Sequence, residues 1–251
     1  MMTTHAHAHA HARGDTKKTT MTAPSSTHEH TLTNEQVSRY GRHLVLKGIG
    51  VKGQERICQA KVLVVGAGGL GSPACLYLAG AGVKELGIMD GDVVDRSNLH
   101  RQVIYSEGAV GRSKAEAASL RCQALNSTIT CTAYKEHLTP TNGFIVGRYD
   151  IILDCTDNVN TRYLIAHLAH VYGGKPVVMG SAQRQDGQVA VLGAGGPCYQ
   201  CIYPNPATRT EARCSDTGVF GVVPGTIGIL QALQALNWIV KHHHHHHHHH
   251  H

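Results

Sequence analysis

The 251-residue sequence lacks the features that would place it in a membrane, outside the cell or on a nucleic acid. It has no run of 18 or more apolar residues, so we expect no membrane-spanning helix. The N-terminus lacks the apolar core of a secretory signal. No basic stripe is interleaved with aromatic residues, and the formal net charge is only +6, so no direct nucleic-acid partner is expected. These absences together predict a cytoplasmic protein.

Large apolar side chains are almost absent from both ends of the chain. Residues 1–31 alternate His with Ala and then become rich in Thr, Ser and Lys, so they cannot offset the entropy of ordering and are expected to be disordered. Residues 242–251 are ten consecutive histidines, which we interpret as a purification tag or a low-complexity tail. The remaining 32–241 is long enough for one α/β domain with a full core.

The eight cysteines contain only one Cys-x-x-Cys pair, Cys198 and Cys201. In the absence of a secretory signal, reduced thiols are favoured over disulfides. Such a pair in a turn-rich loop suits half of a tetrahedral zinc site. The cysteines within helix or strand patterns are most simply small core residues; they are Cys58, Cys75, Cys122, Cys131 and Cys155.

Strand and helix patterns alternate through most of the chain, which predicts a Rossmann-like, doubly wound and mostly parallel sheet with flanking helices. A helix capped by Thr33 is expected to open the domain, and 193–215 shows no periodicity. The expected strands are 61–65, 85–90, 128–134, 149–154, 176–182 and 188–193. The expected helices are 33–45, 51–60, 72–82, 114–125, 139–147, 158–172 and 221–240.

The first strand runs directly into a glycine turn, KVLVVGAGGLGS, with Gly66, Gly68 and Gly71 in G-x-G-x-x-G spacing. Asp90 follows Gly71 by 19 residues, where a carboxylate can accept hydrogen bonds from ribose hydroxyls. The turn therefore predicts a phosphate group at a helix N-terminus. Alone, it does not distinguish NAD from another nucleotide, and it is also compatible with tight strand–helix packing.

Further polar residues are expected at the same edge of the sheet. Asn98 and Arg101 lie in the loop after the second strand, Lys114 begins the next helix, and Asp157 follows a buried strand. Two cations suit a triphosphate whose charge must be neutralised as pyrophosphate leaves, and Asp157 suits a bridging Mg²⁺. Taken singly, Arg101 and Lys114 are better explained as solvated surface charges; together with the glycine turn, they favour a triphosphate site.

The order of motifs along the chain resembles that of the MoeB/ThiF adenylyltransferases, relatives of the ubiquitin-activating enzymes. The motifs are RYGRHLVL, GAGGLGS, MDGDVVDRSNLHRQ, GRSKAEAA, DCTDNVNTRY, GQVAVL, PCYQC and CSDTGVFGVVPG. The resemblance runs from about residue 32 to 240. Within the family, the segments PCYQC and CSDTGV are most similar to those of the eukaryotic molybdopterin-synthase sulfurylases, which also serve tRNA thiolation.

The resemblance implies an ATP site and a homodimer. In the family, Arg42 on the first helix reaches the ATP of the partner subunit, and the alternative here is a surface charge paired with Glu35 or Gln36. Cys214 matches the cysteine on the family's mobile crossover loop, which is implicated there in a thioester or persulfide step; the alternative is a small buried loop residue. The residues implied to hold ATP and Mg²⁺ are Gly66, Gly68, Gly69, Gly71, Asp90, Asn98, Arg101, Lys114, Asp157 and Asn158.

The implied reaction is adenylation of the C-terminal glycine of a ubiquitin-like sulfur-carrier protein ending in Gly-Gly. Pyrophosphate is released, and a cysteine desulfurase or rhodanese then supplies sulfur for molybdenum cofactor synthesis or tRNA thiolation. In the family a second Cys-x-x-Cys completes the zinc site and a rhodanese domain follows. This chain shows neither, so the zinc site is expected to be incomplete and the domain to lack its C-terminal part.

Three other functions compete with this interpretation. An NAD-dependent oxidoreductase needs a catalytic acid or base near the nicotinamide, and no sequence motif identifies a candidate for that role. A non-catalytic subunit of a heterodimeric activating enzyme usually lacks part of the ATP set, which is complete here. A tRNA cyclic-threonylcarbamoyl-adenosine dehydratase shares the fold, but the cysteine segments favour a protein substrate.

Overall fold

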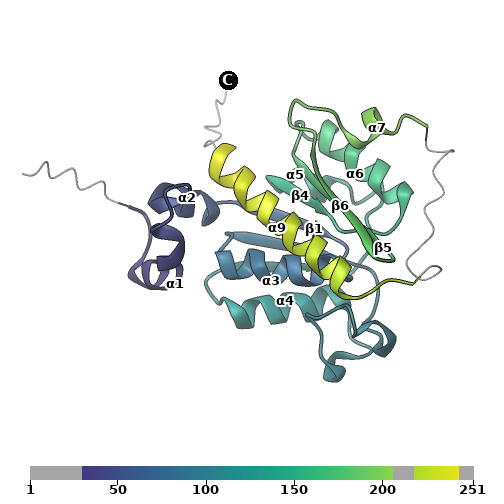
Figure 1. Cartoon of the computed structure of the whole chain (residues 1–251), viewed down its shortest axis with the longest axis horizontal. Coiled ribbons are helices and arrows are strands. Elements are labelled where there is room, and N and C mark those ends of the chain that lie inside the picture. Colours follow the sequence, from purple (N-terminus) through teal and green to yellow (C-terminus); the bar gives the residue numbers. More distant parts are fainter. Residues whose placement is uncertain (1–29, 206–217, 243–251) are drawn as a thin grey trace, which may run out of the picture.

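The computed structural model describes residues 30–205 and 218–242 (Figure 1). The expectations for residues 1–29, for Cys214 and for the histidines from 243 onward fall outside these described residues.

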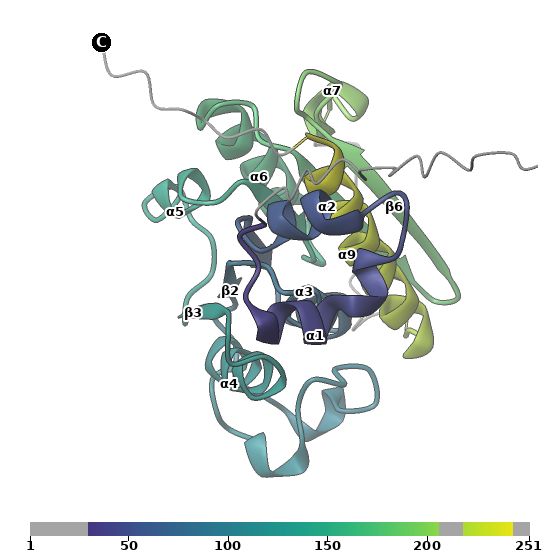
Figure 2. The same ribbon diagram turned by 90° about the vertical axis from the view of Figure 1, so that its left-hand side faces the viewer.

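A six-stranded sheet forms the centre of the described part, with helices on both faces (Figures 1 and 2). Its strands are β1 (Lys61–Val65), β2 (Glu85–Met89), β3 (Thr130–Tyr134), β4 (Ile151–Asp154), β5 (Val177–Gln183) and β6 (Asp186–Leu192). The helices are α1 (Asn34–Leu44), α2 (Gly50–Ile57), α3 (Gly71–Ala81), α4 (Lys114–Leu125), α5 (Phe144–Gly147), α6 (Val159–Val171), α7 (Tyr199–Ile202) and α9 (Val222–His242). Two 3₁₀ turns, η1 (Arg96–Asn98) and η2 (Glu107–Ala109), lie between β2 and α4.

The strand order is β3-β2-β1-β4-β5-β6. All neighbouring pairs are parallel except β5 and β6, which form an antiparallel hairpin at one edge. The chain moves outward from β1 to β3 and then returns to the other side of β1 as β4. The predicted doubly wound, mostly parallel fold is therefore confirmed, with its switch of direction between β1 and β4, where ligands bind in such sheets.

Alternate side chains of β1 enter two separate cores. Val62 and Val64 pack with α3, α4 and α9, whereas Leu63 and Val65 pack with residues of α5 and α6. All four are at most 3% exposed. A strand that is apolar on both faces must be covered on both, which is why the continuous apolar run KVLVV predicts a central parallel strand.

The helix α9 passes across the sheet beside α3, as Figure 1 shows in yellow. It is 21 residues long and, by length and composition alone, apolar enough to cross a membrane, although no membrane span was expected. Its buried residues pack against α3, β5 and β6, which accounts for an apolar face inside the fold. Gln231 on this face is fully buried and donates to the carbonyls of Asp154 and Val178.

Element boundaries agree with the sequence except around two short segments. The expected helix 139–147 is only the four-residue α5, because Asn142 accepts from the amide of Thr139 and holds a turn there. The aperiodic stretch after β6 contains α7, one turn long. Thr33 caps α1 as predicted, in a reciprocal capping box with Gln36.

Candidate functional site

The glycine turn joins β1 to α3 by close backbone packing. Gly66 has a φ of +94°, and a Cβ there would lie 2.7 Å from the carbonyl oxygen of Cys155. A Cβ on Gly71 would overlap the carbonyl oxygen of Gly66. Gly68, by contrast, has room: the nearest atom to an added Cβ is Nε2 of Gln102 at 3.8 Å. The absence of a side chain at Gly66 and Gly71 therefore permits the close backbone packing of the turn. At Gly68 it leaves free space on the cavity side of the turn.

Asp90 fastens the turn to the end of β2. Its carboxylate accepts from the amides of Ala67 and Asp92, each at 2.8 Å. Burial raises the pKa of Asp90, and the nearby Lys114 together with these two amides opposes the rise. The carboxylate is thus fixed beside the glycine turn, at the place where the sequence spacing predicts an acidic residue.

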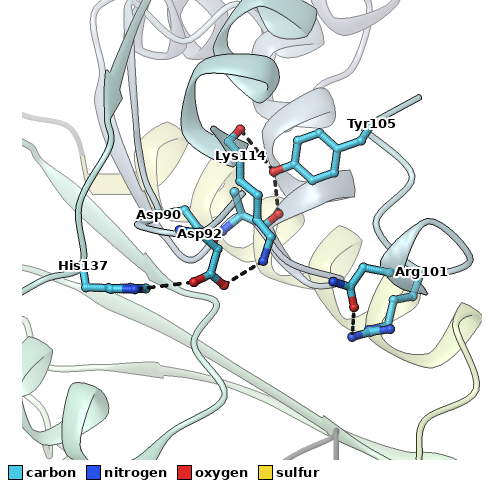
Figure 3. Close-up of polar contacts among 8 residues, drawn as sticks. Asp90, Asp92, Arg101, Tyr105, Lys114 and His137 are labelled. Atoms are coloured by element: carbon cyan, nitrogen blue, oxygen red, sulfur yellow. Dashed lines mark hydrogen bonds and ion pairs between the residues drawn. The ribbon is translucent and has the colours of Figure 1, made fainter. Parts of the chain in front are cut away.

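Two cations lie on the segments that follow β2, each beside a different polar side chain (Figure 3). Lys114 begins α4, is 6% exposed, and places Nζ 2.8 Å from Oδ2 of Asp92. Arg101 lies just after η1 and donates to Oδ1 of Asn98 at 2.6 Å. A buried ammonium is costly unless it is paired, so Lys114 is a poor match for a solvated surface charge.

A cavity of about 570 Å³ connects these groups at the carboxyl edge of the sheet. Its position is the switch point between β1 and β4, which explains why loops from distant parts of the chain line it. The predicted residues that line the cavity are Gly66, Gly68, Gly69, Asp90, Asn98, Arg101, Lys114, Asp157 and Asn158.

Asp157 and Asn158 differ in what their side chains do. Asn158 caps α6, with Oδ1 accepting from the amide of Thr161 at 2.9 Å. Asp157 is exposed and makes no hydrogen bond or ion pair with any described residue. An acidic side chain that faces a cavity without a partner suits a hard divalent cation such as Mg²⁺.

Gly71 and Arg42 do not line the cavity. Gly71 is buried behind it, at the start of α3. Arg42 is exposed on α1 and pairs with neither expected surface partner, since Glu35 pairs with Arg39 and Gln36 bonds Thr33.

The Cys-x-x-Cys pair lies apart from the cavity, at the start of α7. The Sγ atoms of Cys198 and Cys201 are 3.3 Å apart. Burial alone would raise the pKa of Cys198, but hydrogen bonds from Cys201 and from the local backbone lower it overall. Among residues 30–205 and 218–242, no group of three or more metal-binding side chains occurs. The described residues therefore supply two thiols at this place, half the number of ligands that a tetrahedral zinc site needs.

The cavity residues that were not singled out from the sequence include Asp92, Gln102 and His137. Gln102 is 4% exposed, and its Oε1 has no hydrogen-bond partner among the described residues. A buried amide oxygen that has no hydrogen-bond donor and lies beside the glycine turn indicates a position where a ligand can donate a hydrogen bond. Gln102 directly follows Arg101 in the SNLHRQ motif, which was the available clue. His137 had no local clue.

The sequence of the chain is similar to those of known proteins over most of its length. The ThiF family profile matches residues 40–250. The Arabidopsis thaliana "Adenylyltransferase and sulfurtransferase MOCS3" is 48% identical over 220 residues, covering 86% of this chain and 47% of that protein. The Zea mays MOCS3-1 of the same description is 50% identical over 206 residues, covering 81% and 44%. The chain therefore spans about half the length of the curated relatives it matches.

Solved structures show the same fold at lower identity. Escherichia coli MccB with succinimide aligns with a TM-score of 0.68 and 22% identity, covering 84% of this chain and 65% of that one. MccB with ATP aligns with a TM-score of 0.65 and 24% identity, covering 84% and 64%. From the family match over most of its length, the glycine turn and the converging polar residues, the chain belongs to the ThiF family.

Proposed function

We propose that the cavity binds ATP and that the protein transfers AMP to the C-terminal carboxylate of a ubiquitin-like sulfur-carrier protein. The observation that carries this proposal is the convergence of Arg101 and Lys114 on a cavity that opens from the glycine turn. A hydride-transfer enzyme has little use for two further cations there. A triphosphate does, because negative charge builds up on the leaving pyrophosphate. The names of the plant relatives, which pair adenylyl transfer with sulfur transfer, support the same assignment.

The nucleoside end of ATP would lie against Asp90, with the ribose hydroxyls donating to its carboxylate. The phosphates would follow the turn from Gly66 through Gly68 and Gly69 towards the N-terminus of α3, where backbone amides and the helix dipole favour an anion. The unpartnered Oε1 of Gln102 faces this region and would accept a ligand donor.

The phosphate chain would exchange partners with the two cations. Without nucleotide, Lys114 is paired with Asp92 and Arg101 with Asn98. Phosphate oxygens would take over these ammonium and guanidinium donors. Asp157 would hold a Mg²⁺ ion, which supplies neutralising charge to the phosphates when bound.

The carrier's terminal glycine carboxylate would attack the α-phosphorus atom. The bond from that phosphorus to the bridging oxygen then breaks, the electron pair leaves with pyrophosphate, and an acyl-adenylate remains. The attacking carboxylate is already ionised at neutral pH, so no general base is required. Catalysis would rest on positioning and on charge stabilisation by Arg101 and Lys114.

Further proposals concern the assembly and the later steps. Arg42 is exposed without a described partner, as expected if it serves the ATP site of a partner subunit in a homodimer. Cys214, outside the described residues, would attack the carbonyl carbon of the acyl-adenylate as a thiolate, forming a thioester with the carrier and releasing AMP. Cys198 and Cys201 would bind Zn²⁺ together with ligands beyond the described residues. A cysteine desulfurase or rhodanese would supply sulfur, for molybdenum cofactor or tRNA thiolation, in the cytoplasm.

Pyrophosphate–ATP exchange tests the proposed function. We expect exchange only when a carrier ending in Gly-Gly is present, and none with the same carrier amidated at its terminal glycine. Lys114→Ala and Asp157→Asn should abolish exchange. The matched controls Lys84→Ala and Asp186→Asn alter exposed residues that do not line the cavity and should retain it. Exchange that persists in Lys114→Ala, or that needs no carrier, would contradict the proposal.

A further inference from the structure

The carboxylate of Asp92 lies between two basic side chains (Figure 3). Its Oδ2 is 2.8 Å from Nζ of Lys114, and its Oδ1 is 3.5 Å from Nε2 of His137. One carboxylate therefore serves two potential cations. Lys114 is nearly buried, whereas the side chain of His137 is 69% exposed and open to solvent protons.

His137 follows β3 and lines the same cavity as Lys114. Its imidazole packs against the segment that links Asp90 to Asp92: a Cβ added to Gly91 would lie 2.6 Å from its Cδ2. The ring is therefore placed by contact with the chain, next to the carboxylate.

We propose that His137 is a positioning residue for Lys114, acting through Asp92. When the imidazole is protonated it shares the Asp92 carboxylate, which loosens the hold of that carboxylate on the ammonium of Lys114. The ammonium is then available to the phosphates of a nucleotide. This inference rests on the proposed function, since it concerns the same cavity and an anionic ligand.

Other charged groups near the imidazole are already engaged. Asp90 is held by two backbone amides, and the residues beside His137 in the chain are bonded elsewhere. Lys135 pairs with Glu116 of α4, and the carboxylate of Glu136 accepts from Asn142. Asp92 is thus the acidic group through which the charge of His137 is transmitted to the phosphate-binding cation.

The consequence is a thermodynamic linkage between protons and nucleotide. Imidazoles change charge near neutral pH. The protonation state that binds the ligand more tightly is, by thermodynamic reciprocity, also the state that ligand binding stabilises. ATP binding should therefore take up protons at His137, and ATP affinity should rise as the pH falls. Because ion pairs at partly exposed sites are weak, we expect the affinities of the two protonation states to differ by about two- to fivefold. That ratio corresponds to an uptake of about 0.2 to 0.4 proton per ATP near the midpoint of the titration.

Isothermal titration calorimetry of the full chain, in buffers of low and high ionisation enthalpy, measures the uptake. The variants are His137→Gln, Asp92→Asn and the matched control His167→Gln, which alters an exposed histidine of α6 outside the cavity. MgATP is the probe, and adenosine provides the arm without phosphates. We expect wild type and His167→Gln to take up more protons with ATP than His137→Gln and Asp92→Asn do. With adenosine, all four proteins should give the same value.

Each other outcome overturns the inference. Equal uptake in wild type and His137→Gln, with ATP still bound, would leave the proposed function standing and remove this role. A difference that persists with adenosine would mean a direct contact with the nucleoside. Weaker ATP binding or a lower melting temperature in His137→Gln, without a change in proton uptake, would mean a purely structural role. No ATP binding by folded wild type would refute the proposed function as well.

Discussion

Alanine at Gly71 and alanine at Gly68 should damage the protein in different ways, although the chemical change is the same and the sites are three residues apart. A Cβ on Gly71 overlaps the carbonyl oxygen of Gly66, so α3 must move away from β1. Overpacking of this kind typically costs about 1–3 kcal/mol, and part of it is offset by a gain of under about 1 kcal/mol in helix propensity. We place Gly71→Ala near the upper part of that range, at about 2 kcal/mol net, because the clash is with backbone.

A Cβ on Gly68 meets only Nε2 of Gln102, at 3.8 Å, and projects where the phosphates are proposed to lie. Stability should change by less than about 0.5 kcal/mol. ATP affinity should fall at least about tenfold, which corresponds to about 1.4 kcal/mol.

Differential scanning fluorimetry and calorimetric titration with ATP separate the two effects. For a domain of this size, we expect Gly71→Ala to lower the melting temperature by about 4–8 °C. Gly68→Ala should keep the wild-type melting temperature and bind ATP poorly. Wild-type ATP affinity in Gly68→Ala would refute the assignment of the turn to phosphate. A wild-type melting temperature in Gly71→Ala would refute the packing argument.

Three further changes test other parts of the structure. Burial raises the pKa of Asp90 in the folded state above its ordinary value of 3.8. The unfolded chain therefore loses this proton at a lower pH than the folded protein does, and the free energy of unfolding falls as the pH rises through this interval. In urea titrations, Asp90→Asn should therefore gain stability relative to wild type between about pH 4 and neutral pH, while ATP affinity falls. Gln231→Leu leaves two buried strand carbonyls without this donor and should lower the free energy of unfolding by about 2–4 kcal/mol, measured by urea denaturation. Among the seven cysteines of the described residues, iodoacetamide should label Cys198 first and at lower pH than an ordinary thiol, whereas burial keeps Cys122 and Cys155 unreactive until unfolding; peptide mass spectrometry measures the order.

The sheet and most helix boundaries were predictable because they depend on local patterns. Continuous apolar runs predicted the buried strands, and Thr33 predicted the start of α1. The glycine spacing predicted the turn before α3. The helix at 139–147 was overestimated because the side chain of Asn142 binds backbone locally, and helical spacing of apolar residues does not show that competition.

Most of the candidate site was predictable for a topological reason. Carboxyl ends of parallel strands share one edge, so Asp90, Lys114 and Asp157 had to gather there once the strands were placed. The contact between Asp92 and His137 was not predictable, because it joins loops 45 residues apart whose side-chain directions no local pattern fixes. That Arg42 has no ion-pair partner among the described residues was not predictable for the same reason.

The most direct test of the account is which bond of ATP is broken. The protein is incubated with a carrier ending in Gly-Gly and with ATP labelled on either the α- or the γ-phosphate. The account predicts that the α-label appears on the carrier as an acyl-adenylate and that the γ-label is released as pyrophosphate. Release of the γ-label as orthophosphate, with ADP formed and no label on the carrier, would contradict it.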